Sequence, residues 1–247
     1  MLRAICRHRA LQPALVGLAL AMILDVATAQ AQRRPREGRG AFEAGFMLLD
    51  LDDLNSALGS AGYSSLDDTF LTLGGPLSGT RSKMFLGIEG HGLLTEEEST
   101  ADGSRQVSLD GGYGLFRLGY LAYSDSGFDV IPAIGVGGGS VRLKIAELVA
   151  PSFDDILEDP GRSSTLRMDM FLVDASVGID YRFVTSRERR RAGGFLAGLR
   201  GGYVFAPWST SWDLEGIASV GGGPDANIQG FYLRASVGGW GRGSRRR

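Results

Sequence analysis

A strict alternation of apolar and polar residues over positions 171–183 constrains the fold of this chain more than any other feature. Every odd position in this stretch is apolar, whereas the even positions include Asp174, Asp180 and Arg182. Successive side chains of a β-strand point to opposite faces, so a strand here has one apolar and one charged face. In a soluble sheet the charged face meets water, and in a sheet that spans a membrane the apolar face meets lipid. The rest of the chain has to distinguish these two environments.

The N-terminus has the layout of a secretory signal peptide. Arginines at positions 3, 7 and 9 precede an apolar run from 14 to 24, and alanines at 27, 29 and 31 offer a cleavage site. The run is about half the roughly 20 residues that a membrane-spanning helix needs, so we predict a signal peptide over 1–31 rather than an anchor. Cys6 is the only cysteine, and it lies inside this segment. The mature chain therefore has no disulfide or thiol chemistry.

Composition excludes some partners and agrees with a strand-built membrane protein. Without residues 1–31, 23 basic and 27 acidic residues remain, a net charge of −4, so no basic surplus indicates a nucleic-acid partner. No later segment is apolar enough for a helical span, so membrane residence would have to use strands. The 38 glycines gather within apolar segments, where they permit bends and bulges.

Eight strand-like segments follow a basic lead-in over 32–39, which we expect to be disordered. The segments are 40–51, 67–75, 82–95, 105–123, 128–145, 164–184, 194–207 and 228–240. Short or charged turns (75–81, 124–127 and 185–193) alternate with longer polar loops (52–66, 96–104, 146–163 and 208–227). An up-and-down membrane barrel requires this alternation, because its turns and loops lie at opposite ends. The predicted fold is all-β: a single antiparallel up-and-down transmembrane β-barrel of about eight strands over 40–240, followed by a basic tail over 241–247.

Two segments break the alternation. In 128–145 the apolar parity changes across the glycines at 137–139, and a β-bulge there would restore it. In 105–123 Arg117 has the same parity as the apolar Val107, Leu109 and Leu115. This indicates either a second bulge or a different register.

The signal peptide, the eight alternating segments, their aromatic ends and the turn–loop parity together resemble the small eight-stranded outer-membrane β-barrels of Gram-negative bacteria. Glycine-laced stretches such as 111–116 and 199–203 are typical of that class. The resemblance implies a place in the bacterial cell outer membrane, contact with its lipid and lipopolysaccharide, and insertion by the outer-membrane assembly machinery; a monomer is expected. Such chains usually end on an aromatic residue that this machinery recognises. Here Trp240 could take that part, but 241–247 follow it.

The inward parity of the segments predicts a network of charges in the lumen. Its expected members are Glu43, Glu89, His91, Asp174, Asp180, Arg182, Arg200 and Arg234. Buried charges persist only when they are paired, so we expect Arg234 to pair with Glu43 across the closing seam, and Arg200 with a carboxylate of 164–184. An aromatic girdle is expected at the membrane boundaries. Its members are Phe171, Tyr181, Phe183, Tyr203, Phe205, Trp208, Trp212 and Trp240.

Motifs for catalysis, cofactors or metals are scarce. His91 is the only histidine after the signal peptide, and no serine or aspartate partner stands at a motif spacing from it, so no catalytic residue is predicted. The acidic clusters at 50–53, 96–98 and 154–159 lack the spacing of a dedicated calcium loop, so no metal and no cofactor is predicted. Short loop helices are expected over 51–58 and 145–157.

The function we expect is that of a non-enzymatic barrel with a structural or surface-binding role, its lumen plugged by inward charges and its loops extracellular. Side chains just fill the interior of about eight strands, which argues against bulk conduction. Three alternatives stay open. A lipid A acyl hydrolase or acyltransferase needs His91 and a serine to converge near one rim, and a narrow channel needs a continuous water path. A soluble periplasmic lipid-binding barrel needs its apolar parity to face inward.

Overall fold

The structure is a computed structural model, and it describes residues 36–94, 98–99, 105–147, 163–188, 191–214 and 218–243. The chain divides into two compact units, Met1–Arg34 and Pro35–Arg247, and the described residues all belong to the second. The predicted signal peptide, residues 32–35 of the lead-in and residues 244–247 of the tail lie outside the described residues.

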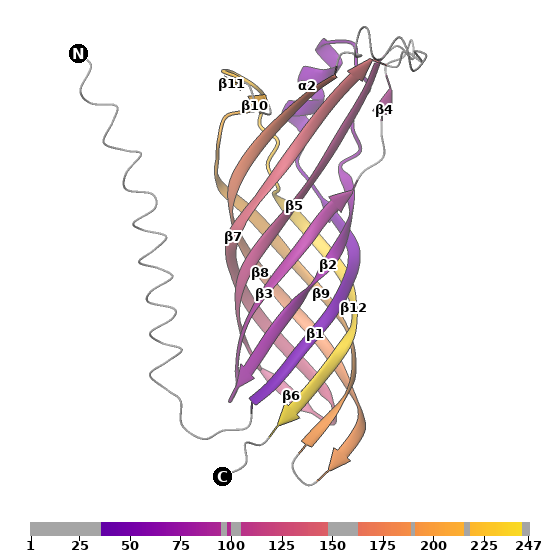
Figure 1. Cartoon of the computed structure of the whole chain (residues 1–247), viewed down its shortest axis with the longest axis vertical. Coiled ribbons are helices and arrows are strands. Elements are labelled where there is room, and N and C mark those ends of the chain that lie inside the picture. Colours follow the sequence, from indigo (N-terminus) through magenta and orange to yellow (C-terminus); the bar gives the residue numbers. More distant parts are fainter. Residues whose placement is uncertain are drawn as a thin grey trace, which may run out of the picture. The chain divides into compact units, whose positions relative to one another are not determined.

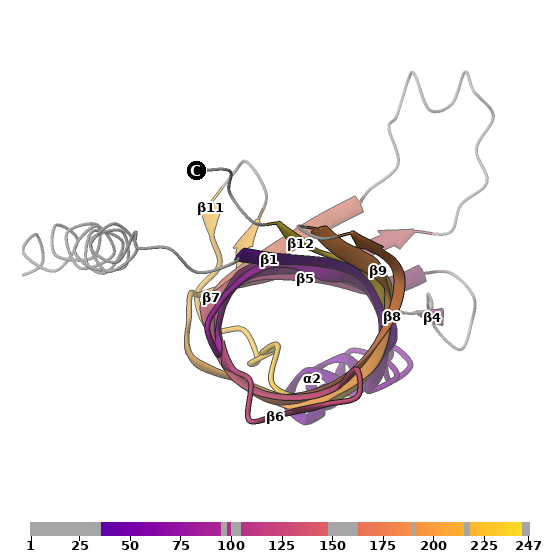
Figure 2. The ribbon, with the colours of Figure 1, turned by 90° about the horizontal axis from the view of Figure 1, so that it is seen from below.

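Eight long antiparallel strands close into a barrel, seen from the side in Figure 1 and along its axis in Figure 2. In ring order they are β1 (Arg36–Leu48), β2 (Thr69–Arg81), β3 (Met84–Leu94), β5 (Arg105–Tyr120), β7 (Phe128–Glu147), β8 (Ser163–Glu188), β9 (Arg191–Ser209) and β12 (Gly230–Gly243). Each strand pairs with the next along the chain, and β12 pairs with β1 to close the ring. The predicted all-β, up-and-down, eight-stranded barrel is confirmed.

Short elements lie at the two ends of the barrel. The first loop contains the helix α2 (Asp52–Ser60), where a loop helix was predicted. Four short strands pair at the rims: β4 (Glu98–Ser99), β6 (Tyr123–Asp125), β10 (Asp213–Leu214) and β11 (Ala218–Ser219). Residues 145–147 extend β7, so the helix expected over 145–157 is wrong at its start, and its remainder lies outside the described residues. In the part of the chain that the structure describes, no helix is long and apolar enough to cross a membrane.

The hairpin turns at the lower end in Figure 1 are tighter than predicted. Ser82 and Lys83 alone connect β2 to β3, and Ser126 and Gly127, with φ of 50° and 92°, connect β6 to β7. Positive φ at both central residues matches the twist of paired strands. Residues 75–81, expected as a turn, are the second half of β2. A Cβ at Gly75 would lie 2.0 Å from the carbonyl oxygen of Ala41 in β1, so this glycine permits close strand pairing.

The strands also extend further at the chain ends than the sequence pattern suggested. β1 begins at Arg36 and β12 ends at Gly243, and the two pair from Arg36↔Gly243 upward. Residues 36–39 are therefore strand rather than disordered lead-in, and 241–243 are strand rather than tail. The physical reason is that Glu37 and Arg39 point into the barrel and find charged partners there, so their charge does not indicate disorder.

β5 and β7 keep one register along their whole length. Their pairings with both neighbours run without a shift, so the bulge expected at 137–139 is wrong, and the bulge that was one of two interpretations near Arg117 is absent. Odd positions of both strands face inward, and the lumen that they face changes from charged to apolar along the strands. Val141 and Leu143 face an apolar part of the lumen, whereas Arg117 faces a charged part. Bulges occur instead between β8 and β9, at Phe171/Val173 and Val184/Ser186.

An apolar cluster fills the interior where the long loops begin; we call it the loop-end core. It joins inward side chains of the strands to α2 and to the segment before β12. Its members include Leu54, Leu58, Val107, Leu109, Val141, Leu143, Leu172, Trp212 and Ile228. α2 is anchored at this end of the barrel, because its Leu54 and Leu58 are buried in the cluster.

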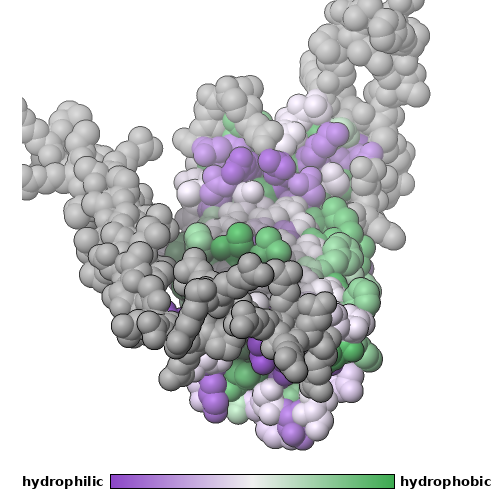
Figure 3. All heavy atoms as spheres, turned by 60° about the horizontal axis from the view of Figure 1, so that its bottom comes forward, coloured by the Kyte–Doolittle hydropathy of each residue, from purple (hydrophilic) through white to green (hydrophobic). Residues whose placement is uncertain are grey.

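The outward positions of the long strands form an apolar belt. Large hydrophobic side chains on every strand of the ring are exposed, among them Phe42, Leu77, Ile88, Phe116, Ile134, Val177, Phe195 and Phe231. Figure 3 shows hydrophobic residues gathered on the side of the barrel. The odd positions of β8 from 171 to 183, which are the apolar positions of the alternating stretch, lie on this outer face.

Candidate functional site

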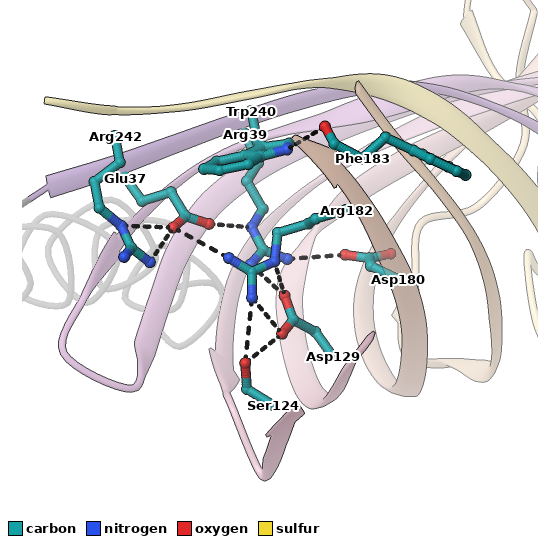
Figure 4. A network of polar contacts seen from close by, with 9 residues as sticks. All are labelled: Glu37, Arg39, Ser124, Asp129, Asp180, Arg182, Phe183, Trp240 and Arg242. Carbon is teal, nitrogen blue, oxygen red and sulfur yellow. Dashed lines mark hydrogen bonds and ion pairs between the residues drawn. The ribbon is translucent and has the colours of Figure 1, made fainter. Parts of the chain in front are cut away.

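One cluster of charges lies inside the barrel near the short turns, and we call it the lower network. It consists of Glu37, Arg39, Asp129, Asp180, Arg182 and Arg242 (Figure 4). Arg39 is its centre: Nε donates to Glu37 Oε1 at 2.8 Å, and Nη2 donates to Asp129 Oδ2 at 2.5 Å. Its Nη1 donates to Asp180 Oδ2 at 3.1 Å. All four of these side chains are buried.

Two further arginines complete the lower network. Arg182 Nη2 donates to Asp129 Oδ1 at 3.0 Å, and Arg242 Nη2 donates to Glu37 Oε2 at 2.8 Å. Trp240 lies beside them with its ring 5.4 Å from the Arg182 guanidinium. The network thus balances three arginines with three carboxylates.

A second cluster, the middle network, lies between the lower network and the loop-end core. It consists of Glu43, Glu89, His91, Arg117, Asp174, Arg200 and Arg234, together with Tyr113 and Tyr232. Glu89 Oε2 accepts hydrogen bonds from Arg117 Nη1 at 2.6 Å and from Arg200 Nη1 at 3.2 Å. Glu43 is held by Arg200 Nη1 at 2.8 Å and by His91 Nε2 at 3.2 Å.

Tyrosines hold the remaining charges of the middle network. The Tyr232 hydroxyl donates to Asp174 Oδ1 at 2.7 Å, and Arg117 lies 3.7 Å from the same carboxylate. Arg234 donates through Nε to Thr72 Oγ1 at 3.2 Å and through Nη2 to the Tyr113 hydroxyl. Its guanidinium also lies 3.8 Å from the centre of the Tyr232 ring, a cation–π contact.

Both pairings expected for Arg234 and Arg200 are wrong. Among the described residues, no carboxylate forms an ion pair with Arg234, and Arg200 pairs with Glu43 and Glu89 rather than with a carboxylate of β8. The strand register explains this, because it places Ser236 rather than Arg234 opposite Glu43 and sets Arg234 directly opposite Arg200. Arg200 pairs with the carboxylates Glu43 and Glu89, whereas Arg234 contacts aromatic side chains.

The structure brings together the residues that parity assigned to the lumen. Glu43, Glu89, His91, Asp174, Asp180 and Arg234 are buried, and Arg182 and Arg200 are partly buried inside the barrel. Sequence reasoning missed Glu37, Arg39, Arg117, Asp129 and Arg242, as well as the tyrosines. Strand parity could have found Asp129, which faces opposite to the outward Val130, Ile134 and Val136. Arg39 and Arg242 were missed because they lay outside the expected strands.

The expected aromatic girdle is only partly on the outer face. Phe171, Tyr181, Phe183, Phe205 and Trp208 are exposed, and Tyr203 has the same outward parity. Trp240 points inward, where its Nε1 donates to the carbonyl of Phe183 at 3.4 Å. Trp212 is buried in the loop-end core, and its Nε1 donates to the carbonyl of Pro224 at 2.7 Å. An indole buried with a satisfied N–H belongs to the interior, so these two assignments are wrong.

A cavity of about 60 Å³ separates the lower network from the middle network. Charged residues of both networks line it, and apolar side chains such as Phe85 and Leu196 complete its wall. Arg117 Nε and Arg200 Nε, from two of the lining residues, have no hydrogen-bond partner among the residues that the structure describes. A cavity of this size has room for water, which can satisfy such donors.

His91 is placed as a network residue rather than at a rim. Its ring is buried between the Glu43 carboxylate and the Tyr113 ring, whose centre is 5.5 Å away.

The described acidic residues at the loop end do not form a metal site. Within the described ranges, no group of three or more histidine, cysteine, aspartate or glutamate residues could hold a metal ion. Partial burial, together with the nearby carboxylates of Asp52, Asp67 and Asp50, raises the pKa of Asp68 there.

The fold and its lumen define an eight-stranded antiparallel barrel with a charged interior. No protein-family model and no curated protein sequence matches the chain. Among solved structures it is similar to the outer membrane protein OprG from Pseudomonas aeruginosa, with 11% identity and a TM-score of 0.35 over 85% of this chain and 96% of that one. It is also similar to the outer membrane protease OmpT from Escherichia coli, with 7% identity and a TM-score of 0.34 over 85% and 96%. A third similar structure is Acinetobacter baumannii CarO, with 11% identity and a TM-score of 0.30 over 83% of this chain and 97% of that one.

Proposed function

We propose that this protein is a bacterial outer-membrane β-barrel with a closed interior, which holds its long loops outside the cell in a structural or surface-binding role. The observation that carries the proposal is the inverted polarity of the barrel wall. Within the belt, the exposed outward side chains are apolar on all eight long strands, while arginines and carboxylates are buried inside. A soluble barrel would expose the charges and bury the apolar face, so lipid is the surrounding that fits this arrangement.

The height of the apolar belt supports the same proposal. On β8 the belt runs from Phe171 to Phe183, between Asp169 and Thr185. At about 3.3 Å per residue and a strand tilt of about 40°, this stretch spans roughly 30 Å, close to the band of about 25 Å on membrane barrels. Aromatic pairs stand at both limits, Phe171 with Trp208 and Tyr181 with Phe183. Amphipathic rings favour such boundary positions.

The filled interior supports a closed lumen. Three successive layers occupy it: the lower network, the middle network and the loop-end core. The ion pairs within the two networks are mostly shorter than 3.3 Å. Separating buried charges would leave them without partners, which is strongly unfavourable. The barrel is thereby a rigid support for the loop end, where α2 and the segment before β12 are anchored.

The decisive experiment combines location and conductance. The full-length chain expressed in a Gram-negative host is expected in the outer-membrane fraction, with a gel mobility that changes on boiling, and to give no steady large openings in planar bilayers. Recovery as a soluble periplasmic protein would refute the membrane assignment. Steady openings would refute the closed interior.

A narrow channel is the second candidate, because the cavity between the two networks already interrupts the packed interior. For a channel, Arg200→Gln is expected to raise conductance sharply, since Arg200 links Glu43 to Glu89 beside that cavity. For a closed barrel it leaves the bilayer silent. A lipid A-modifying enzyme finds less support, because His91 is buried with Glu43 and lies at neither rim.

A further inference from the structure

Two basic residues stand on the outer wall of the barrel at the edge of the apolar belt, on the side of the short turns. Arg81 is the last residue of β2, and Lys83 lies in the two-residue turn that leads into β3. Arg81 has the same outward parity as the exposed Leu77, and Lys83 is exposed. Met84 on β3 pairs with Arg81, Tyr120 on β5 pairs with Met84, and both are exposed. The two cations therefore border the belt directly.

Neither cation has a counter-charge within the described part of the chain. Arg81 and Lys83 form no ion pair with any residue that the structure describes. The buried carboxylates at this end belong to the lower network, and the exposed Asp125, at the next turn, accepts a hydrogen bond from Ser126. Two positive charges thus lie two residues apart at the surface, and an anion from outside the chain can bind them.

The surroundings of these cations suit the boundary between lipid headgroups and hydrocarbon. Lys83 Nζ lies 5.9 Å from the centre of the Tyr120 ring, a cation–π contact that holds the ammonium beside the belt. Tyrosine favours this boundary, because its ring is apolar and its hydroxyl is polar. Gly79, two residues from Arg81 on the same outer face, is exposed, and a Cβ there would meet nothing within 4 Å. An acyl chain can therefore approach the wall closely beside Arg81.

Exposed arginines at the loop end of the same wall have a different setting. Arg142 and Arg167 face each other on β7 and β8, in one register row with Asp110 and Asp213. Asp169 also bonds to Arg167, at 2.7 Å. Carboxylates of the chain surround these two arginines, so the loop-end pair offers a comparison in which basic residues are exposed but already neutralised.

We propose that Arg81 and Lys83 bind the phosphate group of an anionic phospholipid of the inner leaflet, whose acyl chains lie along the adjacent belt. The inference rests on the proposed function, because loops outside the cell place the turn end at the inner leaflet of the outer membrane. A guanidinium binds phosphate oxygens in a bidentate manner, and an ammonium adds a point charge. Both cations stand at the edge of the belt, so contact with hydrocarbon selects a lipid over a free phosphate ion.

Native mass spectrometry of the full-length protein in dodecyl maltoside, titrated with phosphatidylglycerol, tests this proposal. The double variant Arg81→Gln/Lys83→Gln is expected to bind this lipid about tenfold or more weakly than the wild type, because each basic residue beside an anionic lipid contributes roughly fivefold. Arg81→Lys keeps the charge and is expected to stay within about threefold of the wild type. The matched control Arg142→Gln/Arg167→Gln removes two exposed arginines at the loop end and is expected to bind as the wild type does.

The outcomes separate the anionic lipid from other ligands and from the belt itself. Phosphatidylethanolamine, whose own ammonium offsets its phosphate, is expected to bind the wild type about as weakly as phosphatidylglycerol binds the double variant. Glycerol 3-phosphate is expected not to displace phosphatidylglycerol. Equal binding by the wild type and the double variant, an equal loss in the control, or displacement by glycerol 3-phosphate would overturn the proposal.

Failure of this inference can be told apart from failure of the proposed function. All variants should keep the boiling-dependent gel shift and the membrane location. If the wild type has both properties but does not prefer phosphatidylglycerol, only this inference is refuted, whereas a soluble wild-type chain refutes the proposed function.

Discussion

Arg39 and Glu89 show what keeps single charges stable inside this barrel. Each contacts more than one partner: Arg39 bonds to three carboxylates, and Glu89 accepts from two arginines. Moving a charge out of water costs several kcal/mol, and only complete pairing offsets it. The stability of each network therefore depends on its shared members more than on the number of its pairs.

Replacing Glu89 by Gln tests this dependence. The amide removes the charge that Arg117 and Arg200 share, and leaves Arg117 buried with only a distant carboxylate at 3.7 Å. We expect the free energy of unfolding to fall by about 3–5 kcal/mol, measured by urea titration of protein folded in lipid vesicles. Asp110→Asn is the matched control, because its exposed pair with Arg142 at 3.9 Å should contribute less than about 1 kcal/mol. An equally small effect of both substitutions would contradict the shared-partner account.

At the scale of elements, α2 and the loop-end core join a loop to the barrel wall. Leu54 and Leu58 lie one turn apart on the helix and are both buried in the core, while Ser56 faces away and is exposed. Most of the helix's stability has to come from this packing, since nine residues are too few for a stable isolated helix. The order of the first loop therefore depends on the core beneath it.

Leu54→Ala is expected to loosen the loop end without opening the barrel. The cavity it leaves should cost about 2–5 kcal/mol, and the loss should appear as faster hydrogen exchange in α2 and the segment before β12. Exchange in the lower half of β8 should not change. Ser56→Ala on the exposed face is the control and should alter exchange very little. Faster exchange throughout all strands after Leu54→Ala would show that the loop end and the wall unfold as one unit.

The same elements show how much could be predicted from the sequence. Strand number, strand order and the inward parity of β8 follow from alternation, because one face of each strand meets a uniform surrounding. Alternation was misleading in β5 and β7, where the inward face is charged at Arg117 and apolar at Val141. If the lumen is assumed to be polar throughout, a change from charged to apolar inward side chains is misinterpreted as a bulge.

The remaining errors have a different cause. Trp212 and Trp240 were placed by residue type, which cannot show whether an indole faces lipid or interior. The partners of Arg234 and Arg200 depend on the register between β1 and β12, and in a closed barrel that register is linked to the tilt of all the strands. Arg39 was missed because a charged stretch beside glycines has the composition of a linker, while its three partners are far away in sequence.

At the scale of the whole molecule, the belt determines where the barrel can reside. Val177 lies near the middle of the belt on β8, with its side chain about half exposed. Val177→Arg is expected to destabilise the barrel in a bilayer by about 2–4 kcal/mol, measured by urea unfolding from lipid vesicles. Ser186→Arg, on the same strand beyond the belt, should cost about 1 kcal/mol or less. Equal costs at the two depths would show that lipid does not surround the belt.

The composition of the lower network has a consequence for how the barrel assembles. Glu37 and Arg39 come from β1 and Arg242 from β12, the first and last strands of the ring, while Asp129 and Asp180 come from β7 and β8. Asp129 can pair with Arg182 as soon as β7 and β8 have formed their hairpin. Arg39 can pair with Glu37 on its own strand, but its bonds to Asp129 and Asp180 must wait until the ring is complete. Joining the two ends of the sheet and completing the lower network are therefore one event, and a sheet that has not yet closed would hold Asp180 without its arginine until the final strand docks.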